Sequence, residues 1–166
     1  LRSVLGPEVR QAGSRVDADR LRFDFVCFVE VDDAALRAVE SLVQERIFDD
    51  APVTTRETGL DEAVASGAVA LFVNRYGERV RVVSSGAFHS EVCGGTHAAR
   101  TGEIALFKIL SFSTVGRNLK RIEALTGRAA LERMASFEET SRRLSALLEV
   151  PSERLVARVE RLAADL

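Results

Sequence analysis

The stretch of sequence that says most about the fold and function of this chain is Ser90-Glu91-Val92-Cys93-Gly94-Gly95-Thr96-His97. The surrounding segment, residues 86–102, has no clean helical or strand period and holds both histidines of the chain, which predicts a loop or a functional site. A thiolate and an imidazole four residues apart can bind one metal ion if the chain between them curls back, and two consecutive glycines permit that. The spacing alone leaves open the alternative of a buried cysteine beside a surface histidine.

Two further residues could extend such a site. His89 precedes Cys93 by four residues, but Gly94-Gly95 argues against a helix through them, so His89 is interpreted as a solvated side chain. Cys27 lies on the apolar side of an expected strand, which favours core packing. A metal site built from Cys27, His89, Cys93 and His97 stays as a further alternative.

The first 127 residues alternate between strand and helix patterns. Leu21 to Phe28 alternates, with Leu21, Phe23, Phe25 and Cys27 on one face, which predicts a half-buried strand. The other expected elements are a short segment at 11–14 with a turn at 17–19, a helix at 36–47 capped by Asp32 or Asp33, strands at 53–57, 106–113 and 119–125, a short helix at 60–64, and a hairpin of 68–74 with 80–84. This order predicts an α+β fold with a mixed, mainly antiparallel sheet and packed helices.

The pattern changes after residue 127. Residues 129–148 are helical in period, and Pro151-Ser152-Glu153 starts a second helix with Ser152 as the expected cap. Leu155, Val159, Leu162 and Leu166 are spaced like a coiled-coil seam, although two heptads are too few to require one. We therefore expect an α+β domain at 1–127 and a helical, coiled-coil-like extension at 128–166.

Composition narrows the class of protein. The 166 residues carry 23 basic and 25 acidic side chains, so no global positive field draws the chain to nucleic acid, and any such binding needs a local patch. A hydrophobic fraction of 46% excludes a disordered chain. The sequence shows no long apolar run and no secretory leader, and its two cysteines fit a reducing, intracellular setting better than a disulfide scaffold.

Both ends of the chain look cut. It starts at Leu1-Arg2 without Met, in an apolar helical stretch stopped by Gly6-Pro7, and it ends at Leu166 in mid-helix. We therefore expect a piece of a longer protein.

The motif at 90–97, followed by Arg100-Thr101-Gly102-Glu103-Ile104, strongly resembles the editing domain of alanyl-tRNA synthetase and its stand-alone relatives. The helices after residue 127 resemble the start of the coiled-coil arm of the synthetase, which favours the synthetase over the stand-alone proteins. The resemblance covers most of the first 127 residues, through the blocks Val4-Leu5-Gly6, Gln11-Ala12-Gly13-Ser14, Leu21-Arg22-Phe23-Asp24-Phe25, Leu60-Asp61-Glu62-Ala63, Ala70-Leu71-Phe72, Arg79-Val80-Arg81-Val82-Val83 and Arg121-Ile122-Glu123-Ala124-Leu125-Thr126-Gly127.

The resemblance implies hydrolysis of serine or glycine wrongly esterified to the 3′ end of alanine tRNA. A pocket sized for alanine cannot strongly exclude glycine or an added hydroxyl, so a second hydrolytic site is needed. Gln11 matches the polar residue that lines this pocket in the family, and it becomes the candidate reader of the serine hydroxyl. Alanine would leave that group unpaired, at a cost of roughly 1–3 kcal/mol. Without the resemblance, Gln11 would be interpreted as an exposed loop residue.

The resemblance also implies zinc, held by a His-x-x-x-His pair together with Cys-x-x-x-His. Cys93 and His97 match the second half, whereas the first half precedes the position of Leu1 in relatives. We therefore expect half a zinc site, weak or absent metal and no hydrolysis by this chain alone. The parent would be a cytoplasmic ligase using ATP, alanine and tRNA(Ala), with the ATP-binding core outside this chain.

Four basic residues are candidates for binding phosphates of the tRNA acceptor end: Arg100, Arg117, Lys120 and Arg121. Half of them are expected to be ordinary solvated side chains. Two positions depart from the family. Asn118 stands where the family has glycine, and asparagine is the residue that, next to glycine, best tolerates a left-handed backbone. His89 stands where the family has serine.

Two alternatives stay open. One is a stand-alone trans-editing aminoacyl-tRNA deacylase, and the other is a non-catalytic module that binds tRNA or partner helices. We also expect some self-association through the 155–166 seam or through an exposed apolar surface, and no membrane association.

Overall fold

The computed structural model describes residues 1–71 and 76–165. The chain divides into two compact units, Leu1–Gly127 and Arg128–Leu166, and each is described here by itself. None of the helices in the described ranges has the length and apolar character that a membrane span needs.

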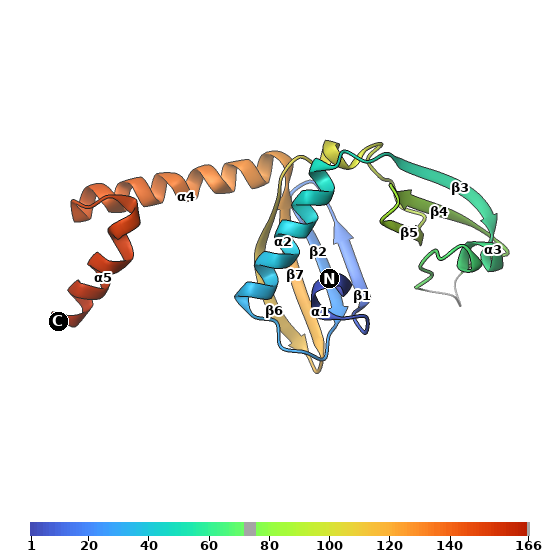
Figure 1. Cartoon of the computed structure of the whole chain (residues 1–166), viewed down its shortest axis with the longest axis horizontal. Helices are drawn as coiled ribbons and strands as arrows, with labels where there is room; N and C mark the ends of the chain where they lie inside the picture. The colour runs from blue at the N-terminus through green and yellow to red at the C-terminus, as the bar shows by residue number, and fades with distance from the viewer. Residues whose placement is uncertain (72–75, 166) are drawn as a thin grey trace. The chain divides into compact units, whose positions relative to one another are not determined.

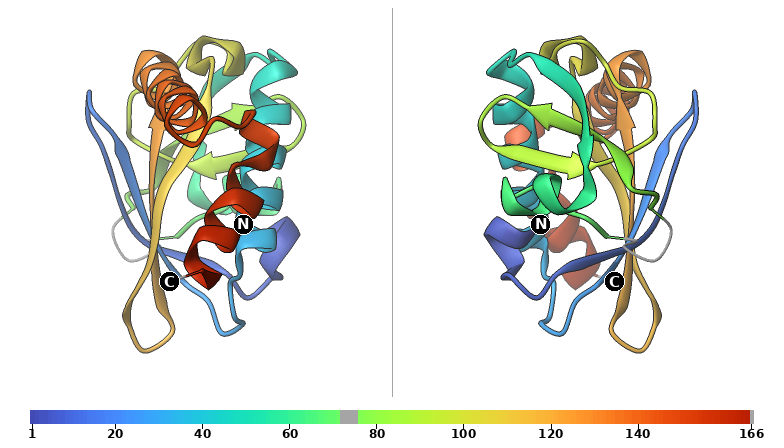
Figure 2. Two further views of the ribbon diagram at one scale, coloured as in Figure 1. Left: turned by 90° about the vertical axis from the view of Figure 1, so that its left-hand side faces the viewer. Right: turned by 90° about the vertical axis from the view of Figure 1, so that its right-hand side faces the viewer.

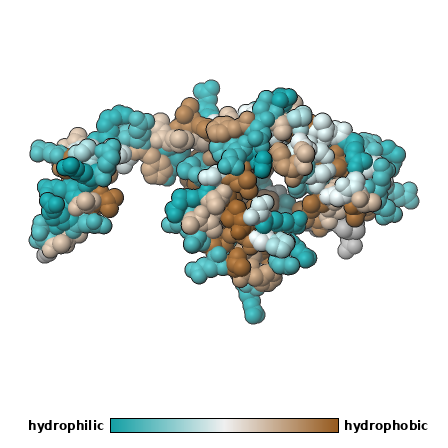
Figure 3. Space-filling view, in the orientation of Figure 1, coloured by the Kyte–Doolittle hydropathy of each residue, from teal (hydrophilic) through white to brown (hydrophobic). Residues whose placement is uncertain are grey.

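The first unit contains a four-stranded antiparallel sheet with the order β1-β2-β7-β6 (Figure 1). Its core is built on apolar residues of β2 and β7, together with residues of the adjoining loops, and residues of α1, α2 and β6 pack against it. Figure 3 shows hydrophobic residues gathered near α1 and α2. The elements are α1 (Arg2–Leu5), β1 (Arg10–Val16), β2 (Leu21–Val26), α2 (Asp33–Phe48), β6 (Phe107–Gly116) and β7 (Leu119–Thr126).

The structure confirms three local predictions, for a helix cap, a turn and a buried cysteine. The Asp32 side chain accepts a hydrogen bond from the Ala35 amide at 2.7 Å and so caps α2. Asn118 adopts a positive φ of 58° in the turn between β6 and β7, which confirms the left-handed backbone expected there. Cys27 is 2% exposed within the core, which confirms core packing.

The strand β1 was not predicted. Its residues are mostly exposed, because β1 lies at the edge of the sheet and pairs only with β2. An edge strand has no need for alternating apolar residues, and a bulge between Gln11 and Gly13 further breaks the period. The short segment expected at 11–14 is thus part of a longer strand, which backbone pairing rather than a side-chain pattern forms.

A second, three-stranded antiparallel sheet has the order β3-β4-β5 and is seen in the right-hand view of Figure 2. Its strands are β3 (Val53–Gly59), β4 (Arg79–Ser85) and β5 (His89–Val92). The helix α3 (Leu60–Ala65) buries Ala63 against Val80 and Val82.

The hairpin expected between 68–74 and 80–84 is wrong in the described part. β4 pairs with β3 on one side and β5 on the other, and Val69 makes only an isolated parallel bridge with Glu91. Residues 72–74 of that expected strand lie outside the described residues. The apolar run at 68–71 reflects burial of Ala68 in the core below α3 rather than strand pairing with β4.

The second unit is helical. It contains most of α4 (Gly127–Leu148), the 3₁₀ turn η3 (Ser152–Arg154) and α5 (Leu155–Ala164). Ser152 does not cap the second helix, because a 3₁₀ turn comes first and neither it nor α5 has a side-chain cap. Leu144, Val159 and Leu162 are exposed. With the two sheets, these helices confirm the α+β class followed by C-terminal helices.

A buried ion pair lies on the face of the four-stranded sheet away from α2. Asp24 on β2 is 8% exposed and accepts two hydrogen bonds from the Arg121 guanidinium on β7, at 2.7 and 2.9 Å. These bonds hold the pKa of Asp24 below its ordinary value, while burial acts in the opposite direction. The ionised carboxylate is therefore favoured in the folded chain.

We predict that Asp24→Asn lowers the free energy of unfolding in a pH-dependent way. Because the folded pKa is lowered, the stabilisation is fully present above the unfolded pKa of about 4 and is lost as the pH falls through the folded value. Urea unfolding from pH 3 to 7 should show the largest difference from wild type above about pH 5. Asp19→Asn, in the exposed turn after β1, is the control, and a difference for Asp24→Asn that does not vary with pH would contradict this account.

Candidate functional site

The structure brings Cys93 and His97 together just beyond the end of β5. The Cys93 Sγ and His97 Nε2 atoms lie 3.3 Å apart, with Cys93 half-buried and His97 exposed. Two ligands of one tetrahedral zinc ion, at about 2.3 Å for sulfur and about 2.0 Å for nitrogen, lie about 3.5 Å from each other. The separation of the pair therefore fits two ligands of one metal ion.

Arg81 on β4 holds the segment that carries this pair. The Arg81 carbonyl accepts a hydrogen bond from the Cys93 amide at 3.1 Å, which continues the β4–β5 ladder by one residue. The Arg81 Nη1 atom donates to the Cys93 carbonyl at 3.0 Å and to the Gly95 carbonyl at 2.7 Å. Sequence reasoning used Arg81 only as part of a matching block. Its one local signal was a cation between the apolar strand residues Val80 and Val82.

The two glycines between Cys93 and His97 have ordinary backbone angles and differ in their surroundings. Neither Gly94 nor Gly95 is among the glycines with positive φ. A Cβ atom added at Gly95 would lie 3.5 Å from Cys93 Sγ and 3.8 Å from His97 Nε2, whereas one added at Gly94 would meet nothing within 4 Å. Gly95 therefore lies directly against the pair, and Gly94 faces open space.

His89 is engaged by a neighbouring acid. Its Nε2 lies 3.2 Å from Glu91 Oε2, and both residues are on β5. The pKa of Glu91 is lowered chiefly by this hydrogen bond from His89, with smaller contributions from the charge of His97 and a hydrogen bond with Cys93, while burial opposes them. Sequence reasoning missed Glu91. Strand alternation places His89, Glu91 and Cys93 on one face, which was the available signal.

The alternative site of Cys27, His89, Cys93 and His97 is not formed. Cys27 is buried in the core of the four-stranded sheet, and its thiol donates to the Val29 carbonyl at 3.6 Å. Within residues 1–71 and 76–165, no three His, Cys, Asp or Glu side chains are placed to hold a metal ion. A four-ligand site at Cys93 and His97 therefore needs ligands from outside the described residues.

Gln11 lies on β1 in the other sheet and does not hydrogen-bond to Cys93 or His97. Its Nε2 donates to the Ser14 hydroxyl at 3.0 Å. The Oε1 atom has no hydrogen-bond partner among the residues that the structure describes. The side chain is half-buried on a strand rather than in a loop.

The four basic candidates differ in how far they are engaged. Arg121 is held by Asp24, and Arg100 binds both the carboxylate of Asp50, at 2.8 Å, and its carbonyl. Lys120 donates to the Thr114 hydroxyl at 2.9 Å. Arg117 is exposed in the β6–β7 turn and has no ion pair within the described ranges. Arg117 and Lys120 thus have the most freedom to meet a phosphate.

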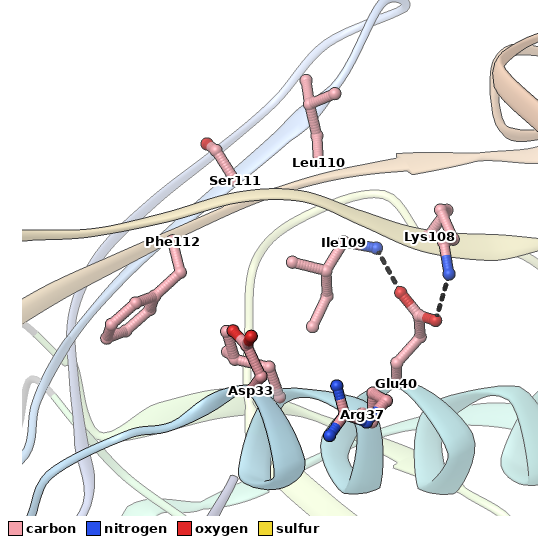
Figure 4. A pocket seen from close by; sticks show the side chains of 9 residues that line it. Asp33, Arg37, Glu40, Lys108, Ile109, Leu110, Ser111 and Phe112 are labelled. Carbon is pink, nitrogen blue, oxygen red and sulfur yellow. Dashed lines mark hydrogen bonds and ion pairs between the residues drawn. The ribbon is translucent and has the colours of Figure 1, made fainter. Parts of the chain in front are cut away.

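A groove with a volume of about 380 Å³ lies elsewhere, between α2 and β6 (Figure 4). Glu40 spans it, since its carboxylate accepts hydrogen bonds from the Lys108 ammonium at 2.6 Å and the Ile109 amide at 2.8 Å. None of the predicted site residues lines this groove. Its polar groups tie the helix to the edge strand, so we assign it a structural role.

Comparison with known proteins identifies the class of domain. Residues 80–123, which include Arg81, Cys93, His97 and Arg117, match the family described as the threonyl and alanyl tRNA synthetase second additional domain. This part of the chain is therefore similar to a domain of aminoacyl-tRNA synthetases.

Full-length relatives narrow this class. The chain is 46% identical over 165 residues to the alanine–tRNA ligase of Fervidobacterium nodosum, covering 99% of this chain and 19% of the relative. It is 46% identical over 162 residues to that of Thermoanaerobacter pseudethanolicus, covering 98% of this chain and 18% of the relative. The match to that of Levilactobacillus brevis is 49% over 150 residues, covering 90% of this chain and 17% of the relative.

The chain thus spans about a fifth of the length of these relatives. It is homologous, over nearly its whole length, to one segment of the alanine–tRNA ligases, which confirms the resemblance read from the motif at 90–97.

We predict that Gly95→Ala slows alkylation of Cys93 by iodoacetamide by about threefold or more, because the added methyl group lies against the sulfur. Gly94→Ala, whose methyl group meets open space, is the matched control and should change the rate by less than about twofold. Cys27 is 2% exposed, so Cys93 dominates the measured rate. Equal rates for the two variants would contradict the placement of Gly95.

Proposed function

We propose that this chain is the editing segment of an alanine–tRNA ligase and that, together with ligands from outside the described residues, it forms the site that hydrolyses the ester of serine or glycine mischarged onto tRNA(Ala). The observation that carries the proposal is the 3.3 Å approach of Cys93 Sγ and His97 Nε2 inside the matched tRNA synthetase domain. A chance Cys-x-x-x-His spacing would not by itself bring the two side chains together. The parent protein would catalyse ATP-dependent alanylation of tRNA(Ala) through regions outside this segment.

The cofactor that we assign to the pair is zinc, with Cys93 and His97 as two of its ligands. Their separation fits that ion, and a thiolate with an imidazole is a donor set that zinc prefers. When bound, zinc supplies Lewis-acid polarisation of an ester carbonyl. The remaining ligands come from outside the described residues.

Two other residues of the chain, Arg81 and Gln11, have proposed roles in positioning the ligands and in recognising the substrate. Arg81 fixes the carbonyls on both sides of Gly94, which holds the ligand pair in place. The Oε1 of Gln11, which has no hydrogen-bond partner in the described part of the chain, is the group that we assign to the hydroxyl of a serine substrate. Its amide already binds a hydroxyl, that of Ser14, so the side chain is oriented in advance. An alanyl group lacks this hydroxyl and would gain nothing from Gln11.

We predict that His97→Ala and Cys93→Ala each lower the rate of seryl-tRNA(Ala) deacylation by about 10–100-fold or more, because each removes a metal ligand. The full product of the gene is assayed with seryl-tRNA(Ala) and alanyl-tRNA(Ala). His89→Ala is the control, since this exposed histidine pairs with Glu91 rather than with the Cys93–His97 pair. Gln11→Ala should lower the preference for seryl over alanyl ester by about tenfold.

Three results would each count against the proposal. The first is wild-type protein that binds tRNA without hydrolysing either ester, which would indicate a non-catalytic binding module. The second is an equal effect of His89→Ala and His97→Ala. The third is unchanged activity after removal of zinc by chelation, which would refute the assigned cofactor.

We predict that Arg117 contributes more to binding of the tRNA acceptor end than Arg100 does. Arg117 has no acidic partner in the described part of the chain, whereas Arg100 is held by Asp50. Arg117→Ala should weaken binding and reduce the slope of log K against log salt concentration by about 1. A filter-binding series in salt measures both, and an unchanged slope would remove Arg117 from the interface.

A further inference from the structure

Arg81 is the one cation seen to bind the backbone around Cys93 within the described ranges. It lies in β4, whose neighbours are β3 and β5. Its Nη1 donates to the carbonyls of Cys93 and Gly95, which flank Gly94 on either side. One guanidinium nitrogen therefore bridges the two peptide units between which the chain turns toward His97.

The charge of Arg81 is not neutralised by an acid in the described residues. Its register partner on β3 is Glu57, but the Glu57 carboxylate pairs with Arg79 at 3.8 Å. The guanidinium is directed to two carbonyl oxygens instead. Hydrogen bonds with a charged donor are roughly twice as strong as neutral ones, so the two contacts restrain the segment more than ordinary turn bonds would.

The restrained segment has little else to hold it. Gly94 and Gly95 have no side chains, and glycine loses more conformational freedom on ordering than any other residue. Gly94, Gly95 and Thr96 are all exposed. The 3.3 Å approach of Cys93 Sγ and His97 Nε2 therefore depends on a restraint from outside the segment.

We propose that Arg81 is the positioning residue of the candidate site, which sets the Cys93–His97 pair by bridging the carbonyls of Cys93 and Gly95. It touches neither ligand side chain and acts only through the backbone between them. The inference rests on the proposed function in one respect, that the pair is the set of metal ligands which Arg81 serves. The restraint itself is independent of that function.

Three variants separate this role from a general contribution to β4. Arg81→Met keeps most of the side-chain volume and removes both donors. Arg81→Lys keeps the charge and can donate to both carbonyls from a stem of different reach, so it should restore part of the effect. Arg79→Met is the matched control, because Arg79 lies on the same strand, is exposed and pairs only with Glu57 in the described residues.

The first measurement is the backbone order of residues 94–96 by ¹⁵N relaxation on the full chain. In wild type and Arg79→Met the order parameter should be near 0.85, about the value of rigid backbone. In Arg81→Met it should fall below about 0.6 at residues 94–96 only, with Arg81→Lys between the two. Amides of β4 and β5 should keep their wild-type values, which shows that the sheet is intact.

The second measurement is Co²⁺ binding, followed by the sulfur-to-cobalt absorption band, and the third is deacylation kinetics of the full gene product. Arg81→Met should weaken Co²⁺ binding by about 10–100-fold. It should lower kcat for seryl-tRNA(Ala) with little change in KM, because Arg81 donates to backbone carbonyls and is not among the residues that we propose as RNA contacts. Arg81→Lys should recover part of both.

Unchanged order at residues 94–96 in Arg81→Met would overturn the proposal, whatever the enzyme does. An equal loss in Arg79→Met would also overturn it, since the effect would then belong to the strand in general. If Arg81→Met does not fold, Arg81→Lys decides the matter by the same order parameters. Loss of order in Arg81→Met, in a protein whose wild type neither binds Co²⁺ nor deacylates seryl-tRNA(Ala), would support the positioning role and refute the proposed function.

Discussion

The register between β4 and β5 is the constraint on which the candidate site depends. The ladder runs from Ser85 opposite His89 to Val82 opposite Val92, and the Cys93 amide then bonds to the Arg81 carbonyl. A slip of one residue would turn every side chain of β5 to the opposite face, because strand side chains alternate. Cys93 would then lie on the opposite face of the sheet. Burial of Val82 and packing of Val92 against the same core maintain this register. A small apolar cluster therefore determines the position of the Cys93 thiol.

The arginines near the site show how a basic side chain can serve the fold rather than a ligand. Arg121 and Asp24 form a bidentate pair on the sheet, and Arg100 binds the side chain and backbone of Asp50. Gly102 lies so close to Asp50 that an added Cβ would come within 3.0 Å of the Asp50 Cγ atom, so the packing around this pair leaves no space. Arg81 differs, because its partners are carbonyl oxygens. Local charge alone therefore does not identify an RNA contact in this chain.

Sequence reasoning worked where the signal was local. The alternation from Leu21 to Cys27 predicted the buried face of β2. The four-residue spacing of Cys93 and His97 made their approach possible, and the resemblance to the editing domain favoured it over the alternative of unrelated side chains. Sequence reasoning failed where the partner is distant in sequence. Asp24 alternates with the apolar residues of β2 and so falls on the other face, yet it is buried because Arg121, 97 residues away, satisfies its charge.

The same limit explains the residues that sequence reasoning missed. The role of Arg81 depends on β4 lying beside β5, and the alternation of residue types within each strand does not predict which strands pair. Likewise β1 forms by pairing its backbone with β2. Its side chains are mostly exposed and have no alternating apolar pattern that would predict a strand. Backbone hydrogen bonds are available to any sequence, so a strand made mainly by them leaves little trace in the residue types.

In the proposed metal site, the Cys93 sulfur and the His97 nitrogen are held at the separation of two ligands of one ion before that ion binds, which has an energetic consequence. Ordering a residue costs roughly 1–2 kcal/mol in backbone entropy, and a flexible Cys-Gly-Gly-Thr-His segment would pay this when it binds. Here the β4–β5 ladder and Arg81 order the segment during folding, so the cost falls on the stability of the domain rather than on the affinity for the ion. Ligands supplied from elsewhere then meet a preformed half of the site. By this argument, contacts outside the ligand set, above all those of Arg81, decide whether Cys93 and His97 act as one chelating unit.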